Sequence, residues 1–114
     1  MQKNPLVTVI CLSYNHEKFV VEALNSVLQQ NYSPVELIVV DDCSTDKSAS
    51  IIDSWCLQQN NITFIKNEQN SGNTKSFNTA LKIASGDYII DLAADDVLTY
   101  EGIELQVADR KSVV

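Results

Sequence analysis

Apolar residues along the chain fall into four short runs separated by longer segments of mixed character. The runs are residues 7–12, 35–40, 62–65 and 88–92. Polar residues that favour turns follow the first three runs, as in the segment Ser13-Tyr14-Asn15. Short runs that are rich in β-branched residues and end at such turns are typical of buried strands. The pattern therefore predicts four β-strands.

The segments between the runs repeat their apolar residues every three or four positions, which indicates helices that bury one face. The first predicted helix covers residues 17–30, and its buried face consists of Val20, Ala23, Leu24, Val27 and Leu28. The second follows a cap by Ser44 or Thr45, with Asp46 placed favourably in its first turn. Its buried face consists of Ile51, Ile52, Trp55 and Cys56.

A third helix is predicted from about Asn73 to a C-terminal stop at Gly86, and a fourth follows a cap by Thr99. Strands therefore alternate with helices along the chain. Near-continuous apolar strands that are linked by helices indicate a parallel sheet covered on both faces. Right-handed crossovers make this a three-layer, Rossmann-like α/β fold. With 114 residues, of which 45% are hydrophobic, the chain is expected to form one domain over residues 1–114.

The charge balance excludes two classes of partner. The chain has 8 basic and 15 acidic residues, which gives a net charge of −7 with His16 neutral. Nucleic acids and anionic membrane surfaces select basic faces, so we expect neither as a partner. The 3 cysteines lack the spacing of a zinc site, and their odd number does not suit a disulfide framework. A reducing, cytoplasmic location fits this composition best.

Two acidic pairs, Asp41-Asp42 and Asp95-Asp96, follow the second and the fourth predicted strand. In an open parallel sheet, ligands bind at the carboxyl ends of the strands, where both pairs are expected. Adjacent carboxylates without basic partners repel each other, and a hard divalent cation relieves that repulsion. The pattern indicates Mg²⁺ or Mn²⁺ held together with phosphate oxygens. The alternative for Asp42 is that it caps free N–H groups at a helix start.

Several nucleotide-binding motifs are absent from the sequence. It contains no GxxxxGK[ST] segment, which excludes a P-loop. The turn after the first strand contains no glycine, and a dinucleotide-binding Rossmann fold needs glycines there for the close approach of pyrophosphate. A phosphate-binding signalling domain is disfavoured, because its acidic pair would follow the first strand rather than the second.

Four motifs, in order along the chain, resemble the nucleotide-binding half of family 2 glycosyltransferases. They are VTVICLSYN, VELIVVDDCSTD, NSGNTKSFNTAL and GDYIIDLAADDVL, and the resemblance covers residues 5–107. It implies a glycosyltransferase-A fold, truncated after its nucleotide-sugar-binding portion, with strand order 3-2-1-4. It also implies transfer of a sugar from a nucleotide-diphosphate donor, most often a UDP-sugar, with inversion. The acceptor would be a saccharide or a lipid-linked molecule.

The resemblance also implies roles for individual residues. The metal on the donor diphosphate, Mg²⁺ or Mn²⁺, is expected at Asp96 and Asp95. Ala93 stands where the family usually has an aspartate, which leaves the strength of metal binding open. Leu12 departs from the family as well, which often has Pro or Thr at that site. The expected nucleotide-binding residues are Leu12, Tyr14, Asp42, Gly72, Lys75 and Asp95.

The acceptor-binding half of the family and its catalytic base would lie beyond residue 114. We therefore assign no catalytic residue within the chain and expect this fragment alone to be inactive. His16 is interpreted as a surface residue and Phe77 as a core residue. The alternative function is a nucleotide- or metal-binding module without catalysis. Truncation would remove the outer neighbour of the fourth strand, and its apolar edge is expected to recruit a second copy of the chain. The full-length protein is expected in the cytoplasm or at the inner face of the membrane.

Overall fold

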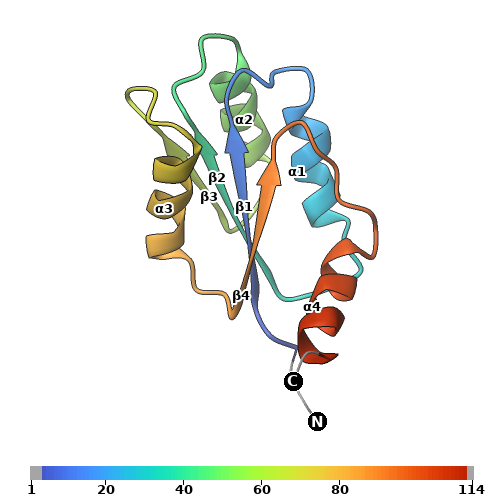
Figure 1. Cartoon of the computed structure of the whole chain (residues 1–114). Helices are drawn as coiled ribbons and strands as arrows, with labels where there is room; N and C mark the ends of the chain where they lie inside the picture. The colour runs from blue at the N-terminus through green and yellow to red at the C-terminus, as the bar shows by residue number, and fades with distance from the viewer. Residues whose placement is uncertain (1–3, 113–114) are drawn as a thin grey trace.

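The computed structural model describes residues 4–112 and contains a four-stranded β-sheet (Figure 1). The strands are β1 (Val7–Ser13), β2 (Val35–Asp41), β3 (Ile62–Lys66) and β4 (Tyr88–Ala93). They lie in the order β3-β2-β1-β4, and every pairing is parallel. This confirms the predicted sheet and its strand order. Of the predicted domain over residues 1–114, residues 1–3 and 113–114 lie outside the described part.

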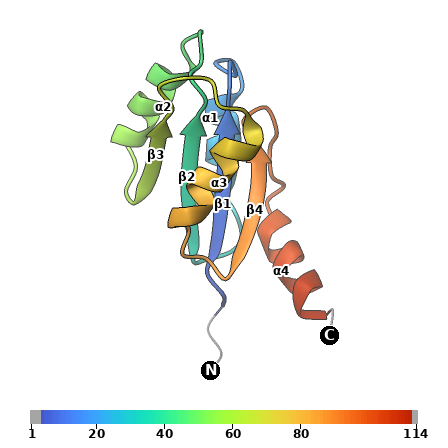
Figure 2. The same cartoon turned by 60° about the vertical axis from the view of Figure 1, so that its left-hand side comes forward.

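The register of the sheet brings the strand ends to one edge, which we call the carboxyl edge. Ser13 at the end of β1 pairs with Asp41 at the end of β2. Leu12 pairs with Ala93 at the end of β4. Because all strands run in the same direction, the loops that follow them emerge side by side at this edge (Figure 2). The two acidic pairs therefore lie at the same edge of the sheet, as predicted.

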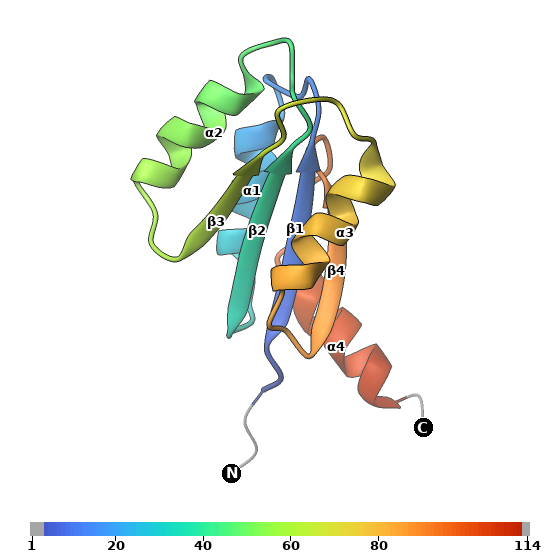
Figure 3. The same cartoon turned by 90° about the vertical axis from the view of Figure 1, so that its left-hand side faces the viewer.

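Helices cover both faces of the sheet, which gives the predicted three layers (Figure 3). The helices are α1 (Val20–Leu28), α2 (Ser48–Leu57), α3 (Asn73–Ile83) and α4 (Gly102–Ser112). α1, α2 and α4 pack on one face, and α3 packs on the other. None of the helices in residues 4–112 is long and apolar enough to cross a membrane.

The hydrophobic core is divided by the sheet into two unequal parts. The main core lies between the sheet and α1, α2 and α4, and it includes the fully buried Val9, Leu24 and Ile103. The smaller core lies under α3, which packs chiefly against β1 and β2. The α3 side of β4 is less covered, since Asp91 and Ala93 on that side are exposed. This uneven cover leaves space beside α3.

The first helix spans Val20–Leu28 and is shorter at both ends than the predicted residues 17–30. The N–H of Val20 donates to the carbonyl oxygen of His16 at 2.9 Å, which closes a turn before the helix. The N–H of Glu17 donates to the Asp46 carboxylate at 3.2 Å. This segment is therefore tied to the loop after β2, and the helix begins only after it.

The predicted cap of α2 by Ser44 or Thr45 is wrong. The helix begins at Ser48, whose N–H donates to the Asp46 carboxylate at 2.8 Å. The Ser44 hydroxyl instead donates to Oδ1 of Asp41 at 2.6 Å. The N–H of Thr45 bonds to the loop after β1. The polar side chains that precede α2 therefore hold loops together, and the helix start is capped by the acid nearest to it.

Gly86 is not the stop of the third helix, because α3 ends at Ile83. Gly86 lies in the turn that leads into β4, where its N–H donates to Oγ1 of Thr8 at 2.9 Å. A Cβ atom at this position would lie 2.5 Å from the same oxygen. Glycine is therefore required for the close approach of this turn to β1.

The segment after α1 supplies the cap of α4. Oε1 of Gln30 accepts a hydrogen bond from the N–H of Ile103 at 2.8 Å, and its Nε2 donates to the carbonyl oxygen of Ser26 at 3.0 Å. The predicted cap by the Thr99 side chain is therefore wrong. The bonds of Gln30 fix the start of α4 against the end of α1.

Replacing Gly86 with alanine is expected to destabilise the fold. The added Cβ would lie 2.5 Å from Thr8 Oγ1 and 2.6 Å from the Thr8 backbone nitrogen, so β1 would have to shift. Overpacking of this kind costs roughly 1–3 kcal/mol in the free energy of unfolding, which urea denaturation measures. Gly102→Ala is the control, since its nearest atom would be the Thr99 hydroxyl at 3.3 Å. An equal effect of the two substitutions would contradict the close approach at Gly86.

Candidate functional site

The loop after β1 is joined to the loop after β2 by the side chain of Asn15. Its Oδ1 accepts hydrogen bonds from the N–H groups of Thr45 and Asp46, at 2.8 and 3.2 Å. Asn15 has a φ of 56°, a left-handed conformation that asparagine adopts more readily than most residues. The N–H of His16 donates to Oγ of Ser48 at 2.9 Å. These bonds fix the first loop at the carboxyl edge.

Asp42 joins the end of β2 to the loop that leads into α3, and it is only 5% exposed. Nδ2 of Asn67 and the N–H of Ser71 donate to its Oδ1, at 2.9 and 2.7 Å. The N–H of Gly72 donates to its Oδ2 at 2.9 Å. Burial acts to raise the pKa of Asp42, but the hydrogen bonds outweigh it and hold the pKa below its usual value. Both oxygens of the carboxylate are therefore used inside the protein.

This network bears on both roles predicted for Asp42. The alternative that Asp42 caps the helix after β2 is wrong, because its carboxylate accepts hydrogen bonds from Ser71 and Gly72, directly before α3. Gly72, also a predicted nucleotide-binding residue, stands directly before α3 with a φ of 87°, where glycine is favoured. Contact of either residue with a nucleotide stays a prediction.

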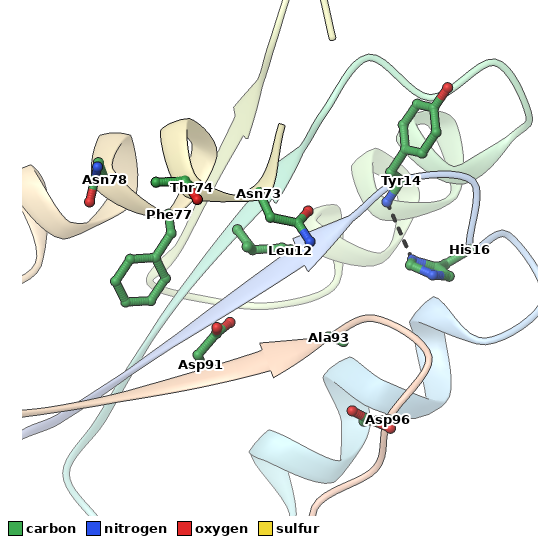
Figure 4. A pocket seen from close by; sticks show the side chains of 10 residues that line it. All are labelled: Leu12, Tyr14, His16, Asn73, Thr74, Phe77, Asn78, Asp91, Ala93 and Asp96. Atoms are coloured by element: carbon green, nitrogen blue, oxygen red, sulfur yellow. Dashed lines mark hydrogen bonds between the residues drawn. The ribbon is translucent and has the colours of Figure 1, made fainter. Parts of the chain in front are cut away.

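A cavity of about 500 Å³ opens between α3, the end of β1 and the end of β4 (Figure 4). Its lining residues are Leu12, Tyr14, His16, Asn73, Thr74, Phe77, Asn78, Asp91, Ala93 and Asp96. β1 and β4 are neighbours at the point where the strand order reverses. The cavity therefore lies where open α/β sheets bind their ligands.

The structure places the predicted nucleotide-binding and metal-binding residues in four different positions. Those that line the cavity are Leu12, Tyr14 and Asp96. Asp42 and Gly72 hold the start of α3 without lining the cavity. Asp95 is exposed beside the cavity, where its carboxylate faces His16. Lys75 lines a different groove, on α3 itself, and is not brought to the cavity.

The first two turns of α3 contribute four lining residues that are absent from the predicted site. They are Asn73, Thr74, Phe77 and Asn78. Their spacing, at i, i+1, i+4 and i+5, places them on one face of a helix that starts at the carboxyl edge. That spacing is the signal in the sequence by which they could be found. Phe77 also packs against the smaller core, so its prediction as a core residue is correct only in part.

His16, which the sequence predicts as a surface residue, is half-buried and lines the cavity. The N–H of Tyr14 donates to its Nδ1 at 3.3 Å. In the neutral ring, the proton is then on Nε2, which lies 3.8 Å from Oδ2 of Asp95. The His16 side chain is 25% exposed and that of Asp95 is 52% exposed. His16 therefore lies beside the segment after β4, at a distance longer than a hydrogen bond.

β4 contributes a carboxylate, Asp91, that the sequence-based site does not contain. Asp91 and Ala93 lie on the same side of β4, because side chains two positions apart in a strand share a face. Both line the cavity. Burial raises the pKa of Asp91 above its usual value. Asp91 could have been found from the sequence, because it is a single charged residue within an apolar strand.

The acidic residues that follow β4 fit a divalent cation only together with a ligand. Within residues 4–112, no group of three or more His, Cys, Asp or Glu side chains could hold a metal ion. Mg²⁺ and Mn²⁺, however, bind through one or two carboxylates and complete their shell with water and substrate phosphates. Asp95 and Asp96 are adjacent and exposed, and the Asp96 carboxylate has no hydrogen-bond partner among the described residues. They therefore suit a metal that arrives with phosphate.

The cavity offers little positive charge of its own. Among the described residues that line it, His16 is the one side chain that can become cationic, whereas Asp91 and Asp96 are acidic. A diphosphate would therefore find neither lysine nor arginine on these walls. A cation must balance its charge, which agrees with the donor set of Asp95 and Asp96.

Residues 8–109 match the sequence model of Glycosyl transferase family 2. The putative colanic acid biosynthesis glycosyl transferase WcaA of Escherichia coli is 34% identical to this chain over 114 residues. That match covers 100% of this chain and 41% of the relative. The chain spans less than half the length of this relative and of a second one, GlyG of Streptococcus pneumoniae, of which it covers 33%.

Two solved structures share the fold. TarS of Staphylococcus aureus, residues 1–349 in complex with UDP, is 35% identical with a TM-score of 0.78, over 90% of this chain and 31% of that chain. The mannosyltransferase PcManGT from Pyrobaculum calidifontis, in complex with GDP-Man and Mn²⁺, is 30% identical with a TM-score of 0.78. The match covers 84% of this chain and 29% of that chain. The likeness confirms the predicted glycosyltransferase-A fold. Because the family match also covers residues 8–109, the chain belongs to glycosyl transferase family 2.

Proposed function

We propose that this chain is the donor-binding part of a glycosyltransferase that transfers a sugar from a nucleotide-diphosphate donor, with UDP as the nucleotide. The observation that carries the proposal is the cavity at the carboxyl edge, which Tyr14 and Asp96 line from the segments that follow β1 and β4. TarS in complex with UDP and PcManGT in complex with GDP-Man and Mn²⁺ support the proposal, since both share the fold.

In this proposal, different residues of the site bind different parts of the donor. Tyr14 is 40% exposed and offers a ring face on which the base can stack. Asn73 and Thr74, on the opposite wall, offer amide and hydroxyl groups to the nucleoside. Asp95 accepts hydrogen bonds from the ribose hydroxyls, and Asp96 holds Mg²⁺ or Mn²⁺. The orientation of the donor thus comes from three separate segments of the chain.

The transfer of the sugar needs positive charge at the leaving diphosphate and a base at the acceptor hydroxyl. A bound metal supplies positive charge to the diphosphate that leaves. An inverting transfer also needs a base that takes the proton of the acceptor hydroxyl. In this proposal the base lies beyond residue 114, together with the site for a saccharide or lipid-linked acceptor. The 114-residue chain then binds the donor without transferring its sugar.

The proposal predicts that UDP binds to the chain only together with a divalent cation. Because the walls of the cavity carry no lysine or arginine, bare UDP meets net negative charge. Titration calorimetry with Mn²⁺ and with excess chelator measures the dependence. Asp96→Asn is expected to weaken UDP binding with Mn²⁺ by at least about tenfold, since metal affinity is sensitive to the loss of a ligand.

Asp53→Asn is the matched control for this experiment. It removes an exposed carboxylate on α2 that pairs with Lys66 at 2.9 Å, away from the cavity. UDP affinity is expected to be the same as in the wild type. Equal binding of UDP with Mn²⁺ and with chelator would refute the metal role of Asp96.

A second prediction concerns the Asp42 network. Asp42→Asn places an amide where three donors now meet a carboxylate, and at least one N–H loses its partner. The cost in the free energy of unfolding is expected to be about 2–3 kcal/mol, as for other hydrogen bonds to charged groups. UDP affinity should fall as well, because the start of α3 forms a wall of the cavity.

The pH dependence provides an independent check on Asp42. Its pKa is lowered in the folded protein, so its stabilising effect is complete above the ordinary value of 3.8 and is lost as the pH falls through the folded value. Urea denaturation of the wild type and Asp42→Asn should therefore give a constant difference near neutral pH and a smaller one in acid. A difference that stays the same in acid would contradict the network.

The outer edge of β4 predicts self-association of the 114-residue chain. Within residues 4–112, β4 pairs with β1 and carries no strand on its other side. An apolar strand with an open edge is a template for pairing with another chain. We propose that a second copy pairs there at high concentration, against a net charge of −7 that salt screens beyond about 8 Å.

Sedimentation over a concentration series tests this association, together with hydrogen exchange of the β4 amides. Ile90 is buried in the main core, so a charged substitution there would unfold the protein instead of testing its edge. Protection of the β4 amides should increase with protein concentration. A chain that remains monomeric at millimolar concentration, with unchanged exchange, would show that the edge does not pair.

A further inference from the structure

Asp91 is a charged residue in the middle of an otherwise apolar strand. Its neighbours Ile90 and Leu92 are buried in the main core. Asp91 points the other way, toward α3, and lines the cavity near Phe77 (Figure 4). Within the described part of the chain, its carboxylate has neither a hydrogen bond nor a salt bridge.

The Asp91 carboxylate lies on the edge strand of the sheet, and no described residue pairs with it. Burial raises the pKa of Asp91, so the charged form is less stable here than in water. Its charge also adds to burial in raising the pKa of the Cys11 thiol to about 12. The Asp91 side chain is nevertheless exposed on the α3 side of β4, so a ligand in the cavity can reach its carboxylate. An unpaired carboxylate that faces a cavity is therefore a candidate for ligand binding.

Ala93 makes Asp91 reachable from the carboxyl edge. The two residues share a side of β4 and lie about 7 Å apart along the strand, roughly the width of a sugar ring. Asp96 lies in the segment that follows β4 and also lines the cavity. The methyl group of Ala93 leaves free space between the two carboxylates. A donor with its diphosphate at Asp96 can therefore extend over Ala93, so that its next ring reaches Asp91.

From this arrangement we propose that Asp91 contacts the sugar ring of the donor and is a specificity-determining residue of the site. The inference rests on the proposed function. The Asp91 carboxylate accepts a hydrogen bond from a sugar hydroxyl. Asn78, on the α3 wall, offers an amide to the same ring, and Phe77 offers an apolar surface to its C–H groups.

Such a subsite distinguishes neutral sugars from acidic ones. A hydroxyl that donates to a carboxylate forms a charge-assisted hydrogen bond. A sugar carboxylate in the same place would instead meet a like charge in a partly desolvated cavity. We therefore expect a neutral, hydroxyl-rich sugar to bind better than a uronic acid.

Calorimetry with UDP, UDP-glucose and UDP-glucuronate, each with Mn²⁺, tests the subsite on the 114-residue chain. The wild type is expected to bind UDP-glucose about tenfold more tightly than UDP-glucuronate. Asp91→Ala is expected to lose about tenfold in UDP-glucose affinity, with UDP affinity unchanged. Asp91→Asn keeps an acceptor oxygen, so it should recover part of the UDP-glucose affinity and bind UDP-glucuronate better than the wild type does.

Glu101→Gln is the matched control, because it removes one negative charge from an exposed residue outside the cavity. Thermal unfolding should show that the Asp91 variants are at least as stable as the wild type. If Asp91→Ala weakens UDP and UDP-glucose equally, or weakens neither, the sugar contact is overturned while the proposed function stands. If it weakens neither and increases self-association, the charge protects the open edge of β4 instead. Failure of the wild type to bind UDP removes the proposed function and this inference together.

Discussion

The hydrogen bonds from Ser71 and Gly72 to the Asp42 carboxylate determine where α3 begins, and the cavity depends on that position. The N–H groups at the start of a helix have no partner within the helix, and a buried anion there is favoured by the helix dipole. Asp42 provides such an anion from the end of β2. A residue that does not line the cavity thus fixes the helix that forms one of its walls.

In the proposed function, the acidic character of the site would make the binding of cation and nucleotide depend on each other. Asp95 and Asp96 give a metal too few protein ligands, and the cavity gives a diphosphate too little positive charge. Each would supply what the other lacks, so the binding of one would raise the affinity for the other by the same factor. The net charge of −7 is compatible with a polyanionic ligand for this reason.

The sheet could be predicted from the sequence because strand order, direction and ends follow from the alternation of apolar runs with helices and from the family resemblance. The helix starts could not, because their partners lie elsewhere in the chain. Gln30 caps α4 from a position more than seventy residues away. Tyr14 and Asp96 were predicted from motifs, and the structure brings both to the cavity. Asp91 lies within the fourth motif, but the resemblance assigns it no role, and its place at the cavity appears only when the side of β4 that it occupies is known.

Side chains along β4 alternate between the main core and the cavity, so the strand has two separate sets of residues. Ile90 and Leu92 face the main core, whereas Asp91 and Ala93 face the cavity. Changes at the first two positions act on folding, and changes at the last two act on what the cavity holds. If the cavity holds the sugar of the donor as proposed, substitutions at Asp91 and Ala93 alone would change the donor, with no repacking of the main core. Divergence in substrate would then need few mutations and would leave the fold unchanged.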